Sequence, residues 1–305
     1  MSKTAFIFPG QGSQFVGMAK DLYDGFSAAK ALFEQAHAIL GFDLATYCFD
    51  GPEDELKQTR VTQPAIFVHS AILTRLLLQR NTRPSMAAGH SLGEYSALYA
   101  AEALSFEDAL RVVKVRAELM QKAGEINKGT MAAIIGLETD ALKDICEEAS
   151  TAGVVQIANY NSPKQLVISG SVAGVTRATE LAKARGAKRA IPLVVSGAFH
   201  SPLMENAIAG LAEALNDVEI RPASIPVYTN VNARPVTAPE EIRQKLYAQL
   251  TSPVRWVEII ENMIEGGATK FYEVGPGNVL TGLSKRINGE VPCVAVDSSK
   301  SLESV

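Results

Sequence analysis

Cysteine is scarce in this sequence of 305 residues, and the three that occur, Cys48, Cys146 and Cys293, lie far apart. No C-x-x-C pair is present, so the sequence has neither the spacing of a structural zinc site nor a disulfide framework. Each cysteine is therefore predicted to be a small buried apolar residue. We expect no metal site.

Long apolar runs are missing as well. No stretch approaches the roughly 18 consecutive apolar residues of a membrane-spanning helix, and residues 1–6 do not resemble the apolar core of a signal peptide. The formal net charge is -4, and few aromatic residues accompany the basic ones, which argues against nucleic-acid binding. We expect a cytoplasmic protein without a membrane or nucleic-acid partner, and a monomer.

What the sequence does contain is an alternation of short apolar segments with helical periodicity. Ala5–Phe8, Pro226–Asn230 and Lys270–Val274 are predicted to be strands. Helical patterns recur at about 26–40, 64–80, 92–101 and 105–123. Strands that alternate with helices predict an α/β fold, in which a parallel sheet is covered by helices on both faces.

Residues 128–195 follow a different order. Strands are predicted at 131–135, 154–158, 166–169 and 190–195, with helices at 139–149 and 173–185. The order βαββαβ is typical of a ferredoxin-like arrangement. The sequence therefore predicts a large hydrolase-like domain of residues 1–127 and 196–305, into which a small domain of residues 128–195 is inserted.

The pentapeptide Gly89-His90-Ser91-Leu92-Gly93 matches the G-x-S-x-G pattern of a nucleophile elbow, a sharp turn from a strand into a helix. Glycine at the flanking positions leaves room for the turn. The turn exposes the Ser91 hydroxyl, and the first N–H groups of the helix point toward any oxyanion that forms there. With an apolar segment before it and an Ala-rich helix after it, the motif predicts acyl transfer through a serine ester.

A serine nucleophile needs a neighbouring base, which is most often histidine. His37 is predicted on a surface helix, and His69 lies in an apolar run typical of the core. His90 adjoins the serine at a sharp turn, where neighbouring side chains diverge. His200 remains, directly after a predicted strand, where catalytic side chains of α/β sheets gather. We therefore predict that His200 is the base.

No acidic partner for this histidine is evident. α/β-Hydrolases place the acid between the serine and the histidine in the sequence. The acidic residues of that interval, Glu94 among them, almost all fall on predicted helices with charged neighbours, which indicates solvated faces. The sequence therefore predicts a Ser–His dyad whose imidazole is oriented by a backbone carbonyl or an amide.

Arg116 lies on the wrong face of its helix. When residues 105–121 are wound at about 100° per residue, the other charged side chains share one face and Arg116 falls between Val113 and Met120 on the apolar face. A guanidinium directed at the core stays ionised and needs a partner. The partner is either an acid in a buried structural ion pair or the carboxylate of a substrate that is held beside the serine.

Several ordered motifs together resemble the malonyl-CoA:acyl carrier protein transacylases of type II fatty acid synthesis, along essentially the whole chain. The matching segments are Phe8–Gln14, Thr62–Ala65, Gly89–Ala97, Arg116, Asn161–Pro163, Gly197–Ser201 and Glu273–Gly277. The resemblance implies a ping-pong transfer of malonyl from coenzyme A to the phosphopantetheine thiol of the carrier protein. Both thioesters are substrates, and no cofactor is implied.

The resemblance also implies roles for individual residues. Ser91 is the nucleophile, His200 the base and Arg116 the malonate clamp, and the N–H groups of Gln11 and Leu92 form the oxyanion hole. The backbone carbonyl of Gln249 orients the histidine. Phe199 restricts a 2-methyl branch on the acyl group. Gln63 lines the acyl pocket, although the polar capping of a turn explains it equally well.

A basic cluster on the predicted small domain and the late helix is a candidate docking face for the acidic carrier protein. Its residues are Lys183, Arg185, Lys188, Arg189, Lys285 and Arg286. A merely solvated surface explains these charges nearly as well. Two other enzymes fit the same elbow: an acyltransferase that serves a polyketide synthase, and a serine thioesterase, which Arg116 and the missing acid disfavour.

Overall fold

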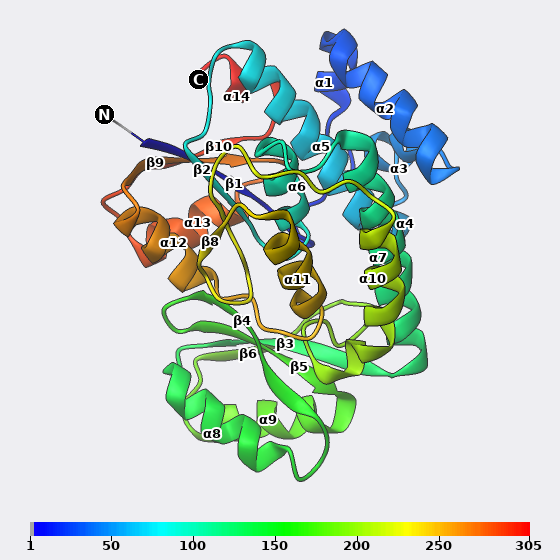
Figure 1. Ribbon diagram of the computed structural model, residues 1–305. Helices are drawn as coiled ribbons and strands as arrows, with labels where there is room; N and C mark the ends of the chain where they lie inside the picture. The colour runs from blue at the N-terminus through cyan, green and yellow to red at the C-terminus, as the bar shows by residue number, and fades with distance from the viewer. Residues whose placement is uncertain (1–2) are drawn as a thin grey trace.

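The computed structural model describes residues 3–305 and contains two β-sheets (Figure 1). The strands of the larger sheet, in spatial order, are β10 (Cys293–Val296), β9 (Ala268–Val274), β1 (Lys3–Phe8), β2 (Met86–Gly89), β7 (Val227–Tyr228) and β8 (Pro235–Val236). All neighbouring pairs are parallel except β7 and β8, which are antiparallel. The predicted parallel α/β sheet is confirmed, with one antiparallel strand at its edge.

Helices cover both faces of this sheet. Successive side chains of a strand point to opposite faces, so an apolar strand needs a helix layer on each side. Phe6 and Phe8 of β1 pack into the main core, whereas Ala5 and Ile7 face a second core. The helices that accompany the large sheet are α1 (Lys20–Gly25), α2 (Ser27–Leu40), α3 (Leu44–Phe49), α4 (Glu53–Leu56), α5 (Thr59–Gln79), α6 (Gly93–Ala100), α7 (Phe106–Ile126), the 3-10 helix η1 (Pro202–Ala207), α10 (Ile208–Asn216), α11 (Pro239–Gln249), α12 (Trp256–Glu265), α13 (Val279–Ile287) and α14 (Ser299–Leu302).

The smaller sheet is antiparallel and lies below the larger one in Figure 1. Its spatial order is β4 (Val155–Ser162), β5 (Gln165–Ser171), β3 (Gly129–Ile135) and β6 (Arg189–Pro192). Helices α8 (Thr139–Ala149) and α9 (Val172–Ala184) cover the face that points away from the larger sheet. The βαββαβ order and the ferredoxin-like arrangement are confirmed. Met131 on the inner face joins the main core, so the two sheets share packing.

Helix α5 is the one helix of residues 3–305 that is long and apolar enough to span a membrane by length and composition. Its apolar window is 89% buried inside the fold, as in the central helix of a globular core. The helix begins five residues earlier than the predicted start at about residue 64, and Pro64 lies inside it, although proline usually occurs in the first turn of a helix. The early start brings Gln63 onto the helix and into the interior.

Candidate active site

The pentapeptide forms a tight elbow between β2 and α6. A Cβ atom added to Gly89 would lie 1.8 Å from the carbonyl carbon of Gly93, and one added to Gly93 would lie 2.1 Å from the carbonyl oxygen of Phe8. Only glycine fits at either position. Ser91, between them, has a φ of 52°, which is a strained backbone conformation for a serine. The sequence motif therefore follows from the close approach of the strand, the turn and the helix.

Asn230 fastens the elbow from the neighbouring strand. It follows β7, which pairs with β2, and its side-chain oxygen accepts a hydrogen bond from the Ser91 N–H at 2.7 Å. Its side-chain N–H donates to the carbonyl of Gly89 at 2.7 Å. One amide thus joins both sides of the turn. The sequence analysis did not single out Asn230, although a polar residue at the carboxyl end of a strand beside the elbow is a recognisable signal.

The structure brings Ser91 and His200 together. The Ser91 Oγ and the His200 Nε2 are 2.8 Å apart. The other ring nitrogen, Nδ1, lies 2.9 Å from the carbonyl oxygen of Gln249 and 3.1 Å from that of Ser252. Since carbonyl oxygens only accept, Nδ1 carries the proton, and Nε2 presents its lone pair to the serine hydroxyl. This tautomer is the one that a general base requires.

Close backbone packing positions the histidine. His200 has a φ of 57° and follows the segment that returns from β6 to the large sheet. This segment passes so close to α7 that a Cβ on Gly124 would lie 2.0 Å from the carbonyl oxygen of Ser196. Gln156 of β4 donates a hydrogen bond to the carbonyl of His200 at 2.7 Å. Both sheets therefore hold the histidine in place.

Burial keeps His200 neutral. Burial lowers the pKa of the imidazole, the positive charge of Arg116 acts in the same direction, and the Gln249 carbonyl opposes the shift, so that the resulting pKa is about 3. The ring therefore accepts a proton only transiently. Two carbonyl oxygens, rather than a carboxylate, stabilise the imidazolium that forms.

Arg116 reaches the same place from α7. It is 1% exposed, and its Nη2 donates to the Ser91 Oγ at 3.1 Å and to the Gln249 Oε1 at 2.9 Å. Its Nη1 donates to the Gln63 Oε1 at 2.5 Å. No ion pair involves Arg116 within residues 3–305, so the structure does not contain the structural ion pair considered above. Three of its five N–H donors are used, which leaves capacity for a substrate carboxylate.

The side chain of Gln249 connects these residues, a role that the sequence did not indicate. Its amide N–H groups donate to the backbone carbonyl of Ser91 at 3.1 Å and to the Glu94 Oε2 at 2.9 Å. With its own backbone carbonyl on His200 and its side-chain oxygen on Arg116, Gln249 contacts three of the predicted site residues and their neighbour. It lies at the end of α11 and is fully buried.

The prediction that the acids after the elbow lie on solvated faces is wrong for Glu94. It is 1% exposed, and its carboxylate accepts from the Asn230 N–H and from Gln249, both at 2.9 Å. Burial raises its pKa to about 7, although these hydrogen bonds and Arg116 oppose the rise. A signal was present: Glu94 is the only charged residue of its helix, α6.

Gln11 and Leu92 lie where the turns after β1 and β2 end. Neither backbone N–H has a hydrogen-bond acceptor among residues 3–305. Leu92 is the N-cap of α6, so its N–H belongs to the helix end whose donors have no intrahelical partner. Two N–H groups without an acceptor are compatible with the oxyanion hole that was predicted, which stays a prediction.

Phe199 precedes the histidine and packs into the main core, being 6% exposed. Its predicted part in selecting the acyl group stays a prediction. Gln63 is buried on α5 and contacts Arg116 and the sulfur of Met120. It does not cap a turn, because it lies inside the helix.

The other histidines lie where the sequence predicts them. His37 is exposed on α2, and His69 is buried with its Nε2 3.0 Å from the Asp297 carbonyl. The His90 ring packs 5.5 Å from that of Trp256, and its Nε2 is 2.8 Å from the Asn161 Oδ1. His90 therefore braces the elbow from behind. Cys48 and Cys146 are buried and Cys293 is partly buried, and no group of potential ligands for a metal occurs within residues 3–305.

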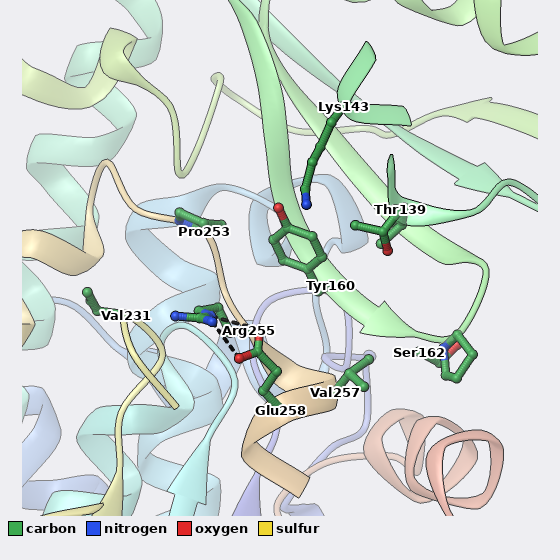
Figure 2. A pocket seen from close by; sticks show the side chains of 11 residues that line it. Thr139, Lys143, Tyr160, Ser162, Val231, Pro253, Arg255, Val257 and Glu258 are labelled. Carbon is green, nitrogen blue, oxygen red and sulfur yellow. Dashed lines mark hydrogen bonds and ion pairs between the residues drawn. The ribbon is translucent and has the colours of Figure 1, made fainter. Parts of the chain in front are cut away.

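A separate cleft of about 450 Å³ lies beside the small sheet (Figure 2). It lies between β4, α8 and the start of α12, and none of the eight predicted site residues lines it. Figure 2 shows Lys143, Tyr160 and Arg255 around it. Its cations are already paired, since Arg255 bonds Glu258 at 2.5 Å and Lys143 bonds Asp140 at 3.0 Å.

The fold and the site together define a class of protein: enzymes that pass an acyl group through a serine ester. The class follows from the elbow, the neutral histidine on the serine hydroxyl and the two free N–H donors. Arg116 adds a buried positive charge beside the serine, which an ordinary serine esterase does not need.

Comparison with known proteins narrows this class. Residues 5–292 match the acyl transferase domain family. A malonyl CoA-acyl carrier protein transacylase of Bacillus subtilis is 47% identical over 304 residues, which are 99% of this chain and 96% of that protein. The chain belongs to this family, the malonyl CoA-acyl carrier protein transacylases. The resemblance indicated by the sequence motifs is thereby confirmed.

Solved structures agree. An acyl carrier protein S-malonyltransferase from Vibrio cholerae has a TM-score of 0.96 and 45% identity, with 99% of each chain covered. A malonyl-transacylase in complex with a type II polyketide synthase acyl-carrier protein has the same TM-score and 42% identity, with 99% of this chain and 98% of that one covered. The predicted hydrolase-like fold with a ferredoxin-like insert is the fold of this family. The predicted domain boundaries stay predictions.

Proposed function

We propose that the protein transfers malonyl from malonyl-CoA to the phosphopantetheine thiol of acyl carrier protein and so supplies the extender unit of fatty acid synthesis. The observation that carries this proposal is the position of Arg116, whose Nη2 lies 3.1 Å from the Ser91 hydroxyl oxygen. A buried guanidinium at that distance suits an acyl group that bears its own carboxylate, because a neutral acyl group would leave the guanidinium without a carboxylate in direct contact.

In the proposed first half-reaction, the Ser91 Oγ attacks the thioester carbonyl while the His200 Nε2 takes the hydroxyl proton. The N–H groups of Gln11 and Leu92 hold the oxyanion of the tetrahedral intermediate. When the intermediate collapses, the carbon–sulfur bond breaks, and the coenzyme A sulfur leaves with the proton from His200. Malonyl remains on Ser91 as an ester.

The second half-reaction runs the same steps in reverse with a different thiol. His200 takes the proton of the phosphopantetheine thiol, and the sulfur attacks the malonyl ester. Ser91 regains its proton as the ester bond breaks. Nucleophile, base, oxyanion donors and clamp all come from the chain, so we propose that both thioesters are substrates and that no cofactor takes part. We further propose that the enzyme acts in the cytoplasm as a monomer.

The experiment that tests this function is incubation with malonyl-CoA followed by intact mass measurement. We expect a stable malonyl adduct on Ser91 that disappears when holo acyl carrier protein is added, with malonyl appearing on the carrier protein. Rapid release of free malonate without an adduct would instead indicate a thioesterase. Ser91→Ala is the control for the site of modification.

A second candidate is the same reaction on a polyketide synthase carrier protein. One observation favours it: the relative of 42% identity was solved with such a carrier protein. Transfer rates to a fatty acid carrier protein and to a type II polyketide carrier protein, measured side by side, distinguish the two roles.

The basic cluster remains the proposed docking face. β3 lies between β5 and β6, and its Ile135 pairs with Gln165 on one side and Arg189 on the other. Arg286 of α13 donates to the Gln165 side chain at 2.5 Å. Arg189 and Arg286 therefore lie near the same end of the small sheet, within about two strand spacings and a side chain of one another. This supports a basic face that includes Arg189 and Arg286, whereas Arg185 is paired with Glu148.

A further inference from the structure

The acid that the sequence analysis dismissed, Glu94, contacts both residues that organise the site. Through Asn230 it supports the Ser91 N–H side of the elbow, and through Gln249 it supports Arg116. Both partners donate to the same oxygen, Oε2. The reaction proposed above assigns no task to Glu94.

The Gln249 amide has one orientation that satisfies all its neighbours. Its oxygen accepts from Arg116 at 2.9 Å, and its nitrogen donates to Glu94 at 2.9 Å and to the Ser91 carbonyl at 3.1 Å. If the amide turned over, its N–H groups would face a guanidinium and its oxygen would face a carboxylate and a carbonyl. The carboxylate of Glu94 therefore fixes the amide, and the amide fixes the guanidinium.

Charge balance gives Glu94 a second task. Arg116 is buried and has no ion-pair partner within residues 3–305, so Glu94, one amide away, is its counter-charge before substrate arrives. The other ionisable groups around the pair are Tyr95, beside Glu94 on α6, and His200, which is neutral. Arg116 in turn lowers the pKa of Glu94, which burial raises to about 7.

A carboxylate bound to Arg116 changes that balance. Two negative charges would then share one buried positive charge, and a like charge nearby favours the protonated form of a carboxylic acid. An acetyl group brings no such charge. The two substrates should therefore leave Glu94 in different protonation states.

We propose that Glu94 is a positioning residue for Arg116 and supplies the negative charge that a malonyl carboxylate replaces, so that Glu94 takes up a proton from solvent when malonyl binds. The inference rests on the proposed malonyl transfer. It explains how a buried guanidinium can stay ionised and aligned in the empty site without blocking the substrate by a direct ion pair.

Proton uptake is measured by calorimetry of malonyl-CoA binding to Ser91→Ala in buffers of different ionisation enthalpy. At pH 7 we expect an uptake of about half a proton per site, given a pKa of about 7 in the empty site. Acetyl-CoA, which carries the same coenzyme phosphates, serves as the reference and should show no such excess. The excess should vanish in Ser91→Ala/Glu94→Gln, whose side-chain oxygen still accepts the two hydrogen bonds.

Kinetics provide the second readout. In the wild type, kcat/KM for malonyl-CoA should fall above pH 7, by about tenfold for each unit by which malonyl raises the pKa of Glu94. Glu94→Gln should abolish this fall. Glu273→Gln is the matched control, because Glu273 is equally buried but accepts from the start of α13, outside the site, and it should keep the wild-type profile.

Glu94→Ala tests positioning. It should lower kcat/KM for malonyl-CoA at pH 7 at least tenfold more than that for acetyl-CoA, and Glu94→Gln should restore the ratio. The inference is overturned if malonyl-CoA binds without excess proton uptake, or if Glu94→Gln keeps the fall above pH 7. If the wild type is not acylated by malonyl-CoA at all, the proposed function fails instead. Thermal unfolding checks that each variant is folded.

Discussion

Two arginines near the elbow have opposite surroundings. Arg116 is 1% exposed and bonds only neutral oxygens, whereas the Arg255 side chain is 38% exposed and pairs with both oxygens of Glu258. The residue after Arg255, Trp256, packs on His90 beside Ser91, so both arginines lie within a few residues of the same turn. An exposed ion pair contributes about 0–1 kcal/mol to stability, and its arginine already has an anionic partner. A buried cation that touches no carboxylate directly is stabilised further by an anion that binds it.

The largest expected effect comes from the serine that Arg116 contacts. Ser91→Ala should reduce malonyl transfer about 10⁴-fold or more, because the nucleophile acts as a unit with His200. Transfer is measured with malonyl-CoA and holo carrier protein. Ser96→Ala is the matched control, since Ser96 is buried on α6, the helix that follows the elbow, and its hydroxyl has no partner among residues 3–305. A large loss in both variants would mean that the helix, not the hydroxyl, matters.

Arg116→Ala breaks the comparison directly. It should lower kcat/KM for malonyl-CoA by about 10²–10³-fold, as expected when a buried charged hydrogen-bond donor is lost from a substrate carboxylate. Activity toward acetyl-CoA should fall much less, so discrimination between the two substrates relaxes. Arg255→Ala should change neither value more than about twofold. An equal loss for both substrates in Arg116→Ala would make Arg116 a structural residue.

Acid should lower the free energy of unfolding through the buried histidines. Unfolded histidines take up protons below about pH 6.5, whereas folded His69 and His200, with pKa values of about 4 and about 3, do not. The unfolded state therefore binds more protons, and the free energy of unfolding falls as the pH drops from 6.5 toward 4. Between pH 7 and pH 4, each histidine should lower the free energy of unfolding by about 3 kcal/mol.

Urea unfolding of His200→Gln across this pH range measures the effect. The variant should lose less stability than the wild type between pH 6.5 and 4. His37→Gln, at an exposed position on α2, is the control and should follow the wild type. If His200→Gln also follows the wild type, burial does not keep His200 neutral.

The smallest effect is expected at the basic face. Lys188→Glu/Arg189→Glu should slow transfer to carrier protein about three- to tenfold at low salt, because charge complementarity acts mainly on the association rate. Acylation by malonyl-CoA alone should change less. Lys143→Glu/Arg255→Glu, at the separate cleft, is the matched charge reversal and should have little effect. Equal transfer rates in the wild type and in Lys188→Glu/Arg189→Glu would contradict the proposed docking face.

Local patterns carried the sequence predictions that the structure confirms. Five consecutive residues predict the elbow. Its glycines are required by close contacts with residues a few positions away and with the end of β1. The βαββαβ order follows from short segments whose periodicity is local. Arg116 was recognisable as unusual because the helical periodicity of residues 105–121 places it on the apolar face.

The supporting network was not predictable in the same way. The bonds of Glu94 to Asn230 and Gln249 span 136 and 155 residues of sequence, and no periodicity relates such positions. Glu94 is the only charged residue of α6, which is a local signal of burial, but its hydrogen-bond partners come from distant parts of the sequence. The predicted pairing of the Gln11 and Leu92 N–H groups likewise depends on the parallel alignment of β1 and β2, which is a contact between distant segments.

Sequence patterns alone predicted the reacting groups: a serine on an elbow, a histidine that follows a strand and lacks an acidic partner, and a cation directed at the core. The tertiary structure decided how those groups are held and charged. Burial keeps His200 neutral and raises the pKa of Glu94. Gln249, at the end of α11, contacts His200 through its backbone carbonyl and contacts Ser91 and Arg116 through its side-chain amide. Protonation depends on solvent exclusion and on neighbours brought together by folding, which residue order does not encode locally.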